Sequence, residues 1–169
     1  MSFPDGPDCK GNRERYLMVE WLKKHPERVR LAIQGDPVAQ FELGRHLIYN
    51  YKSYDPGTGY QVLVKINDKF ERPKASPDEM AQGVMWFRKS ADQGYVEALL
   101  GLGNCYSSGE GVAKDSVEAY AYWNIVSEVD ECGRANRDML AKYKPEIIAR
   151  GEQRTIELLK EYDAKWPKE

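Results

Sequence analysis

ADQGYVEALLGLGNCY, residues 91–106, decides the fold, because an earlier stretch of the chain repeats it. AIQGDPVAQFELGRHL, residues 32–47, lies over it at a shift of 59 residues, and the match includes Gly44 over Gly103. Apolar residues recur at intervals of three and four positions in both stretches, which favours amphipathic helices. We therefore interpret the two stretches as the same helix in two copies of a repeated unit.

A second internal match gives the length of that unit. At a shift of 37 residues, Asp78 falls on Asp115 and Trp86 falls on Trp123. This indicates a repeat period of about 37 residues. The two shifts differ by 22 residues, so the first copy carries an insertion between Leu47 and Asp78.

The inserted residues have a composition of their own. They include DPGTG at 55–59, which is strong turn chemistry, and YQVLVKI at 60–66, an alternating stretch rich in β-branched residues. We expect a long loop or hairpin insertion over residues 52–75 in the first repeat.

The recurring small residues indicate close packing between helices. Ala98 and Gly103 would let a partner helix approach, while Leu102 and Tyr106 on the same stripe would fill the space between the two helices. We assign a structural role to all the recurring positions. They are Ala39, Leu43, Gly44, Trp86, Ala98, Leu102, Gly103, Tyr106, Gly109, Gly111, Asp115, Ala119 and Trp123.

The segment YSSGEGVAKD, residues 106–115, could be a ligand-binding loop or a corner between two helices. It lacks the spacing of nucleotide-binding and calcium-binding loops. Asp115 precedes a helical stretch and Glu118 follows three residues later, which predicts an N-cap with a reciprocal capping box. The corner interpretation is therefore favoured. Ser76 and Glu79, with Pro77 at the first helical position, predict the same cap in the earlier copy.

The aromatic residues of the second helix in each unit are expected to be structural. Trp86 and Trp123 hold equivalent positions and are expected to be buried between adjacent helices. Of Tyr120 and Tyr122, one is expected to face solvent. The match at a shift of 37 residues also continues into the last part of the chain, where it places Ala98, Leu102 and Tyr106 on Ala135, Met139 and Tyr143.

With these positions fixed, the segment from residue 91 to residue 123 resembles a Sel1-like repeat, a helix-turn-helix unit related to the tetratricopeptide repeat. The resemblance rests on Ala91, Gly94, Ala98, Leu102, Gly103, Tyr106, Gly109, Gly111, Val112, Asp115, Ala119 and Trp123. The first unit departs from this pattern at Leu47, which replaces the tyrosine, and at Gln82, which replaces the alanine.

The resemblance implies an all-α fold, a short α-α superhelix (solenoid) formed by one helical-repeat domain over residues 1–169. Its expected parts follow in chain order. They are N-terminal capping helices over 12–34, a first repeat over 32–90, a second repeat over 91–127 and a C-terminal capping helix pair over 128–166.

Composition narrows the function. With 25 basic and 27 acidic residues the net charge is -2, which gives no general attraction to nucleic acid, and no apolar run is long enough to insert into a membrane. The 3 cysteines form no close pair, which favours a reducing compartment. No signal peptide opens the chain, so we expect a cytoplasmic protein as written, or a periplasmic or secreted one if an export signal was removed.

The resemblance implies a non-catalytic protein-binding module, a bacterial adaptor or scaffold that holds a protein partner on its concave face. The insertion over 52–75 is the leading candidate for a second contact, because it resembles interface anchors in its aromatic and basic content. Its candidate partner-binding residues are Tyr51, Tyr54, Tyr60, Lys65, Phe70 and Arg72. These residues could instead pin the loop to its own repeat.

Three other functions remain as alternatives. One is an immunity-type protein that neutralises a toxin or effector. The second is an enzyme using His25, His46, Cys105 or Cys132, although His25 marks a helix boundary, His46 is expected at the surface and Cys105 in the core. The third is a nucleic-acid adaptor that would use the basic residues near the N-terminus, which are Arg13, Arg15, Lys23, Lys24, Arg28 and Arg30. No cofactor or metal is expected, and the oligomeric state is left open.

Overall fold

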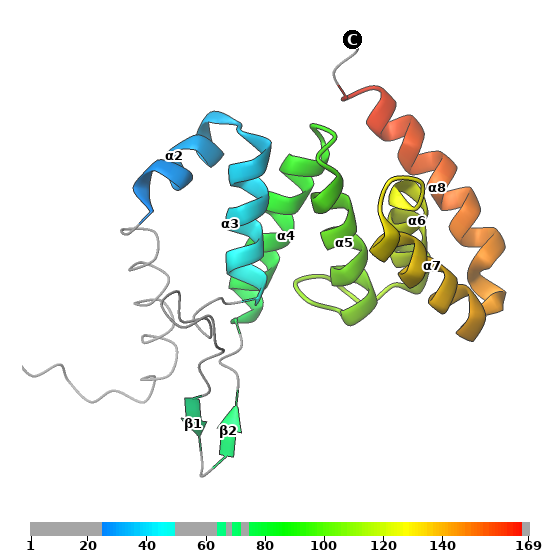
Figure 1. The fold of residues 1–169 in the computed structure, drawn as a ribbon, viewed down its shortest axis with the longest axis horizontal. Coiled ribbons are helices and arrows are strands. Elements are labelled where there is room, and N and C mark those ends of the chain that lie inside the picture. The colour runs from blue at the N-terminus through cyan, green and yellow to red at the C-terminus, as the bar shows by residue number, and fades with distance from the viewer. Residues whose placement is uncertain (1–24, 50–63, 67–68, 72–74, 167–169) are drawn as a thin grey trace, which may run out of the picture.

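The computed structural model describes residues 25–49, 64–66, 69–71 and 75–166 of the 169-residue chain. These ranges are helical except for one short hairpin (Figure 1). In chain order the elements are α2 (Pro26–Gln34), α3 (Pro37–Tyr49), β1 (Val64–Ile66), β2 (Lys69–Glu71), α4 (Pro77–Ala91), α5 (Val96–Ser108), α6 (Ser116–Val126), α7 (Glu131–Tyr143), the 3-10 turn η2 (Pro145–Ile147) and α8 (Ile148–Asp163).

The helices form a continuous array in which each packs on its neighbour in the chain. Helix α2 packs on α3, α3 on α4, α4 on α5 and α5 on α6, while α6 packs on both α7 and α8. Figure 1 shows α3, α4 and α5 side by side, with α6, α7 and α8 at the other end. This arrangement confirms the predicted helical solenoid, in which contacts are made between adjacent units.

The insertion contains an antiparallel hairpin. Val64 pairs with Glu71, Lys65 with Phe70 and Ile66 with Lys69. The hairpin leaves the array between α3 and α4 (Figure 1). The expected loop or hairpin is therefore a hairpin at 64–71, and the strand predicted in residues 60–66 is found at its last three positions.

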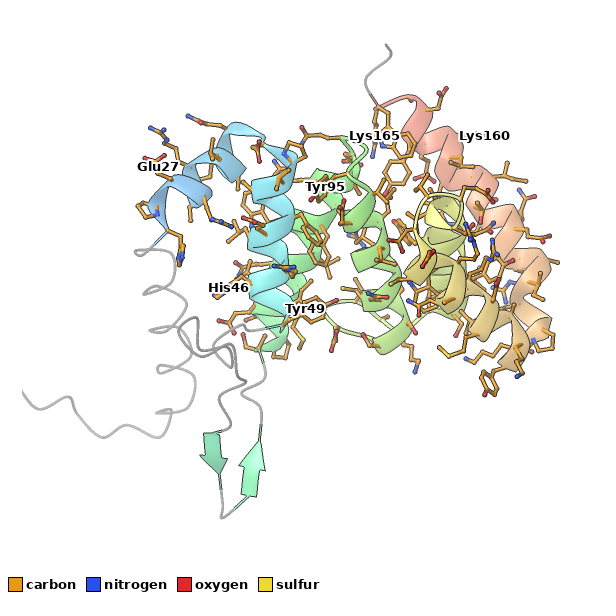
Figure 2. All side chains as sticks on the ribbon, viewed as in Figure 1. Glu27, His46, Tyr49, Tyr95, Lys160 and Lys165 are labelled. Atoms are coloured by element: carbon orange, nitrogen blue, oxygen red, sulfur yellow. The ribbon has the colours of Figure 1, made fainter. Side chains whose placement is uncertain are left out.

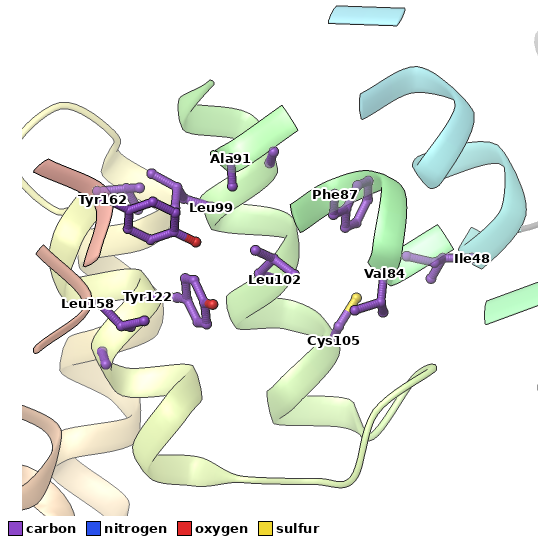
Figure 3. Packing of buried hydrophobic residues seen from close by; sticks show 13 residues of the cluster. Ile48, Val84, Phe87, Ala91, Leu99, Leu102, Cys105, Tyr122, Leu158 and Tyr162 are labelled. Carbon is purple, nitrogen blue, oxygen red and sulfur yellow. The ribbon is translucent and has the colours of Figure 1, made fainter. Parts of the chain in front are cut away.

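Glycines allow α4 to approach α3 and α5. Phe87 of α4 is fully buried, and its ring occupies the space where the Cβ atoms of Gly44 and Gly101 would lie, each 2.7 Å from a ring carbon. The ring also stacks on Phe41, with 5.2 Å between centroids. Figure 3 shows Phe87 next to α3, and Val84 and Cys105 between α4 and α5. Any larger residue at either glycine would have to displace this ring.

The second unit repeats this packing with tryptophan. Trp123 is 4% exposed, and its ring lies 2.6 Å from the position of a Cβ on Gly103. Trp86 differs, because it is half-buried and its ring also contacts Lys89, whose Nζ lies 4.3 Å from the ring centroid. The expectation that both would be buried is therefore wrong for Trp86. Helix α6 is covered by α5, α7 and α8, whereas α4 is covered by α3 and α5.

The two predicted helix caps have different outcomes. Ser76 and Glu79 form the reciprocal capping box, which confirms that prediction. Asp115 caps α6 by accepting from the amides of Val117 and Glu118 at 2.8 and 3.2 Å. The reciprocal half is wrong there, because the Asp115 amide donates to the Tyr106 carbonyl at 2.9 Å and the Glu118 carboxylate accepts from Arg154.

The corner between α5 and α6 depends on its glycines. Gly109 and Gly111 have φ angles of 82° and 70°, in the left-handed region that glycine tolerates best. A Cβ on Gly111 would lie 2.3 Å from the Met80 carbonyl oxygen in the first turn of α4. The corner is therefore packed against the backbone of another helix, which favours a structural role over ligand binding.

Helix α7 departs from the repeat register predicted for it. Met139 and Tyr143 are 54% and 74% exposed, although the match at a shift of 37 residues pairs them with inward-facing positions of α5. The inward side of α7 instead carries Gly133, Asn136 and Leu140. A shift of 38 residues, which places Leu102 on Leu140, describes the packing of α7 better.

Helix α8 returns across α6 to the turn after α4. Its C-terminal end places Trp166 against this turn, where the indole donates to the Ala91 carbonyl at 2.9 Å. The Trp166 ring stacks on Tyr162 at 5.3 Å between centroids. The Lys165 ammonium contacts the Asp92 carboxylate at 2.8 Å. This helix therefore ties the end of the described array to its middle.

That return also decides the two tyrosines of α6. Tyr120 and Tyr122 are 6% and 5% exposed, so the expectation that one faces solvent is wrong. The ring of Tyr120 lies against Gly151 of α8, and Tyr122 lies beside Tyr162 of the same helix (Figure 3). Helix α6 is consequently buried on more than one face.

Candidate functional site

Helices α3, α5 and α7 are the first members of their pairs, and they contact one another along one side of the array. Phe41 of α3 lies 5.3 Å from Tyr95, at the start of α5, between ring centroids. Asn136 of α7 donates to Asn104 of α5 at 3.4 Å. Figure 2 shows Tyr95 at the beginning of α5, beside α3. These contacts join the three helices into one surface.

Each of the three helices contributes four residues to this surface at the same spacing, three, four and four positions apart. The helical period places these residues opposite the buried stripe of their own helix. We call the surface the first-helix face. It comprises Val38, Phe41, Arg45 and Tyr49 of α3, Glu97, Leu100, Asn104 and Ser108 of α5, and Cys132, Ala135, Met139 and Tyr143 of α7, with Asn136 beside them.

The first-helix face combines exposed apolar groups with a cation. Val38 is 44% exposed and Tyr49 39%, and the exposure of Met139 and Tyr143 is higher still. The Arg45 guanidinium lies over the Phe41 ring, 5.7 Å from its centroid. Aromatic residues, methionine and arginine are the types enriched where proteins bind each other. The surface is therefore chemically suited to a protein partner.

A pair of amides lies between α5 and α7 on this face. The Oδ1 atom of Asn104 accepts from the indole of Trp123 at 3.1 Å and from Nδ2 of Asn136. Both asparagines are half-buried. Because an indole N–H can only donate, it holds the Asn104 amide with its oxygen turned inward.

The predicted partner-binding residues lie elsewhere. Tyr51, Tyr54, Tyr60 and Arg72 fall outside the described residues, and Lys65 and Phe70 lie opposite each other in the hairpin. Their role in binding stays a prediction. The sequence signal that could have located the first-helix face is its spacing, which α3, α5 and α7 share.

The candidate catalytic residues do not form a site. His46 is 7% exposed, so the expected surface position is wrong, because it lies within the buried stripe of α3. His25 is at the N-cap position of α2, at the predicted boundary. Cys105 is completely buried and Cys132 is exposed. Within the described ranges, no three histidine, cysteine or acidic residues are grouped as a metal would require.

Thiol labelling tests the different environments of the two described cysteines. Burial raises the pKa of the Cys105 thiol from 9.0 to about 12. At pH 8 we therefore expect iodoacetamide to modify Cys132 of the native protein and to leave Cys105 unmodified, as read by peptide mass spectrometry. The unfolded thiol would ionise near pH 9, so this thiol also lowers the stability of the fold as the pH rises from about 9 towards 12. Equal labelling of both would contradict the burial.

Two basic residues of the nucleic-acid alternative lie in the described part of the chain. Arg28 pairs with Glu42 of α3, and Arg30 pairs with Glu27 at 2.9 Å. Both guanidinium groups thus have acidic neighbours, which reduces the local positive charge that phosphate binding would need.

The described helices also bear on membrane insertion. None of them combines the length and apolar character that crossing a bilayer requires.

Comparisons with known proteins agree with this architecture. Residues 75–95 and 96–125 match the Sel1 repeat, so the matches cover α4 with its following turn and then α5 with α6. No curated protein gives a significant match. A helical array with this repeat defines the class, and the chain is a Sel1-like repeat protein. The division into units at 32–90 and 91–127 stays a prediction.

A solved structure shows the same fold. It is the crystal structure of a protective antigen present in uropathogenic Escherichia coli strains, which displays an SLR fold. The match has 27% sequence identity and a TM-score of 0.55, and it covers 87% of this chain. The chain spans 25% of the length of that protein.

Proposed function

We propose that the chain is a non-catalytic module that holds another protein against its first-helix face. Sel1 repeats are generally protein-interaction modules, which supports the class of function. The observation that carries the choice of surface is the set of residues at common spacing on α3, α5 and α7, which leaves Met139 and Tyr143 exposed. On a curved array this would be the concave side.

The role of the module depends on the partner. An adaptor or scaffold would use the face to bring proteins together, and an immunity-type protein would use it to cover a toxin or effector. The bacterial source of the similar structure supports a bacterial setting for either role. The hairpin insertion, which leaves the array between α3 and α4, would supply a second contact.

Photo-crosslinking from chosen positions tests this proposal. Benzoylphenylalanine replaces Met139 on the first-helix face or, as a control, Ile156 on α8, which is 48% exposed. Because both positions are exposed to a similar degree, differences in yield report on the location of the partner. We expect one partner to be crosslinked in native cells from position 139 and not from position 156.

A third position tests the insertion. The same probe at Tyr60 should crosslink the same partner if the insertion contributes. A partner captured only from position 156, or equally from 139 and 156, would contradict binding on the first-helix face. Mass spectrometry of the crosslinked protein distinguishes a scaffold partner from a toxin or effector.

A further inference from the structure

The Asn104 side chain is held in one orientation by groups of the fold itself. Its Oδ1 accepts from Trp123 and from Asn136, at 3.1 and 3.4 Å. Trp123 is buried and has a donor but no acceptor, so rotating the amide by half a turn would leave the indole unpaired. The Nδ2 group of Asn104 is therefore turned away from Trp123.

The same contact fixes Asn136. Its Nδ2 group is used in the bond to Asn104, which leaves its Oδ1 as the remaining acceptor. Among the described residues, nothing accepts from Nδ2 of Asn104 and nothing donates to Oδ1 of Asn136. Two half-buried amides on neighbouring helices therefore present one donor group and one acceptor, side by side.

A third asparagine shows that this is not how the fold satisfies such amides generally. Asn124 of α6 accepts from Arg137 at 3.1 Å and donates to Thr155 at 3.3 Å. Both ends of that amide are thus bonded within the fold. The Asn104 and Asn136 amides are each bonded at one end only, and both belong to the first-helix face.

A donor and an acceptor without charge match the main chain of a protein. In an extended segment, the N–H and C=O of one residue point to the same side, as in a hydrogen-bonded β pair. Building on the proposed function, we propose that the Asn104–Asn136 pair binds the main chain of an extended segment of the partner. The partner C=O accepts from Nδ2 of Asn104, and its N–H donates to Oδ1 of Asn136.

Apolar groups lie on both sides of the pair. Leu100 is one turn before Asn104 on α5, and Met139 is one turn after Asn136 on α7. Side chains that flank the bound main-chain unit would contact them. Because the hydrogen bonds read only the main chain, the site accepts many sequences and prefers apolar residues beside the bound unit.

The test uses a phage-displayed library of random dodecamer peptides, selected on the wild-type protein. The decisive variant is Asn104→Asp, which keeps an oxygen for Trp123 and Asn136 and replaces the outward donor with an acceptor. We expect selected peptides to bind this variant at least roughly tenfold more weakly, because a donor is lost and two acceptors oppose each other. Unchanged thermal unfolding shows that the variant is folded.

Two further variants make the result specific. Ser108→Asp adds the same charge one turn further along the exposed stripe of α5 and should leave binding unchanged. Methylation of the peptide nitrogen that donates to Asn136 should reduce binding to the same extent as Asn104→Asp. Methylation at the neighbouring positions should have little effect.

Met139→Arg separates this inference from the proposed function. Peptides that bind Asn104→Asp normally but lose binding to Met139→Arg would overturn main-chain recognition and leave the first-helix face as the binding surface. Peptides insensitive to both variants would contradict both proposals. If the wild-type protein retains no peptide above the Met139→Arg background, main-chain recognition is wrong, because such a contact does not depend on sequence. The crosslinking result then decides the proposed function alone.

Discussion

Replacing Trp123 with alanine is expected to lower the free energy of unfolding by roughly 3–5 kcal/mol. The Trp123 side chain is 4% exposed and fills the space left by Gly103 on the facing helix, so its removal opens a cavity between α5 and α6. It also leaves the Asn104 oxygen without its indole donor. A domain of this size is typically stable by only about 5–15 kcal/mol, so thermal unfolding should move down by roughly 6–20 °C.

Trp123→Phe is the matched control for this experiment. It keeps an aromatic ring against Gly103 and removes the indole donor, so it isolates the hydrogen bond and the smaller loss of volume. We expect it to retain more than half of the stability that the alanine variant loses. Denaturant unfolding followed by circular dichroism measures both. An alanine variant as stable as the wild type would mean that the ring is not packed as described.

Gly111→Ala is expected to destabilise the fold by roughly 2–4 kcal/mol, from two separate causes. The residue has a φ angle of 70°, where a side chain costs about 1–2 kcal/mol. The added methyl group would also lie 2.3 Å from the carbonyl oxygen of Met80. Because that oxygen belongs to the backbone of α4, relief requires the corner and the helix to move apart.

Gly109→Ala separates the two causes. Its φ angle of 82° is equally unfavourable, but the nearest atom to its added methyl group is the Lys114 Cβ at 3.4 Å, an ordinary contact. We expect Gly109→Ala to cost only the conformational part, so its midpoint in urea should lie between those of the wild type and Gly111→Ala. Equal midpoints for the two alanine variants would exclude a contribution from the contact with α4.

Much of the fold could be predicted from short-range signals. The helix starting at Pro77 follows from Ser76 and Glu79, whose capping box satisfies backbone amides within one turn. The close approach at Gly103 follows from a small residue that recurs one period apart. Both signals are local, because the residues that produce them lie on the same helix or the same corner.

The candidate site was less accessible to sequence reasoning. The attention given to Tyr60 and Phe70 came from composition, whereas Asn104 and Asn136 carry no compositional signal. Their half-satisfied amides became evident only when α5 and α7 were placed side by side. A hydrogen bond between residues 32 positions apart depends on the packing angle of two helices, which no local pattern records.

Helix α6 shows why the remaining predictions failed. Periodicity identifies one apolar face, and it led to the expectation that Tyr120 or Tyr122 faces solvent. Both are buried, since α8 covers a second face of α6 on its way back to the turn after α4. The one-residue change of register in α7 has the same origin, because that helix packs on α6 without the following helix that α5 has.

The sequence by itself determined the repeat, its helix boundaries and the small residues at the crossing of each pair, because these depend on backbone geometry and on volumes within one unit. The tertiary structure alone decided which faces are covered and which polar groups remain half-bonded. Those properties depend on the path of α8 and on the approach of α7 to α5, and each requires contacts between units that are distant in the chain.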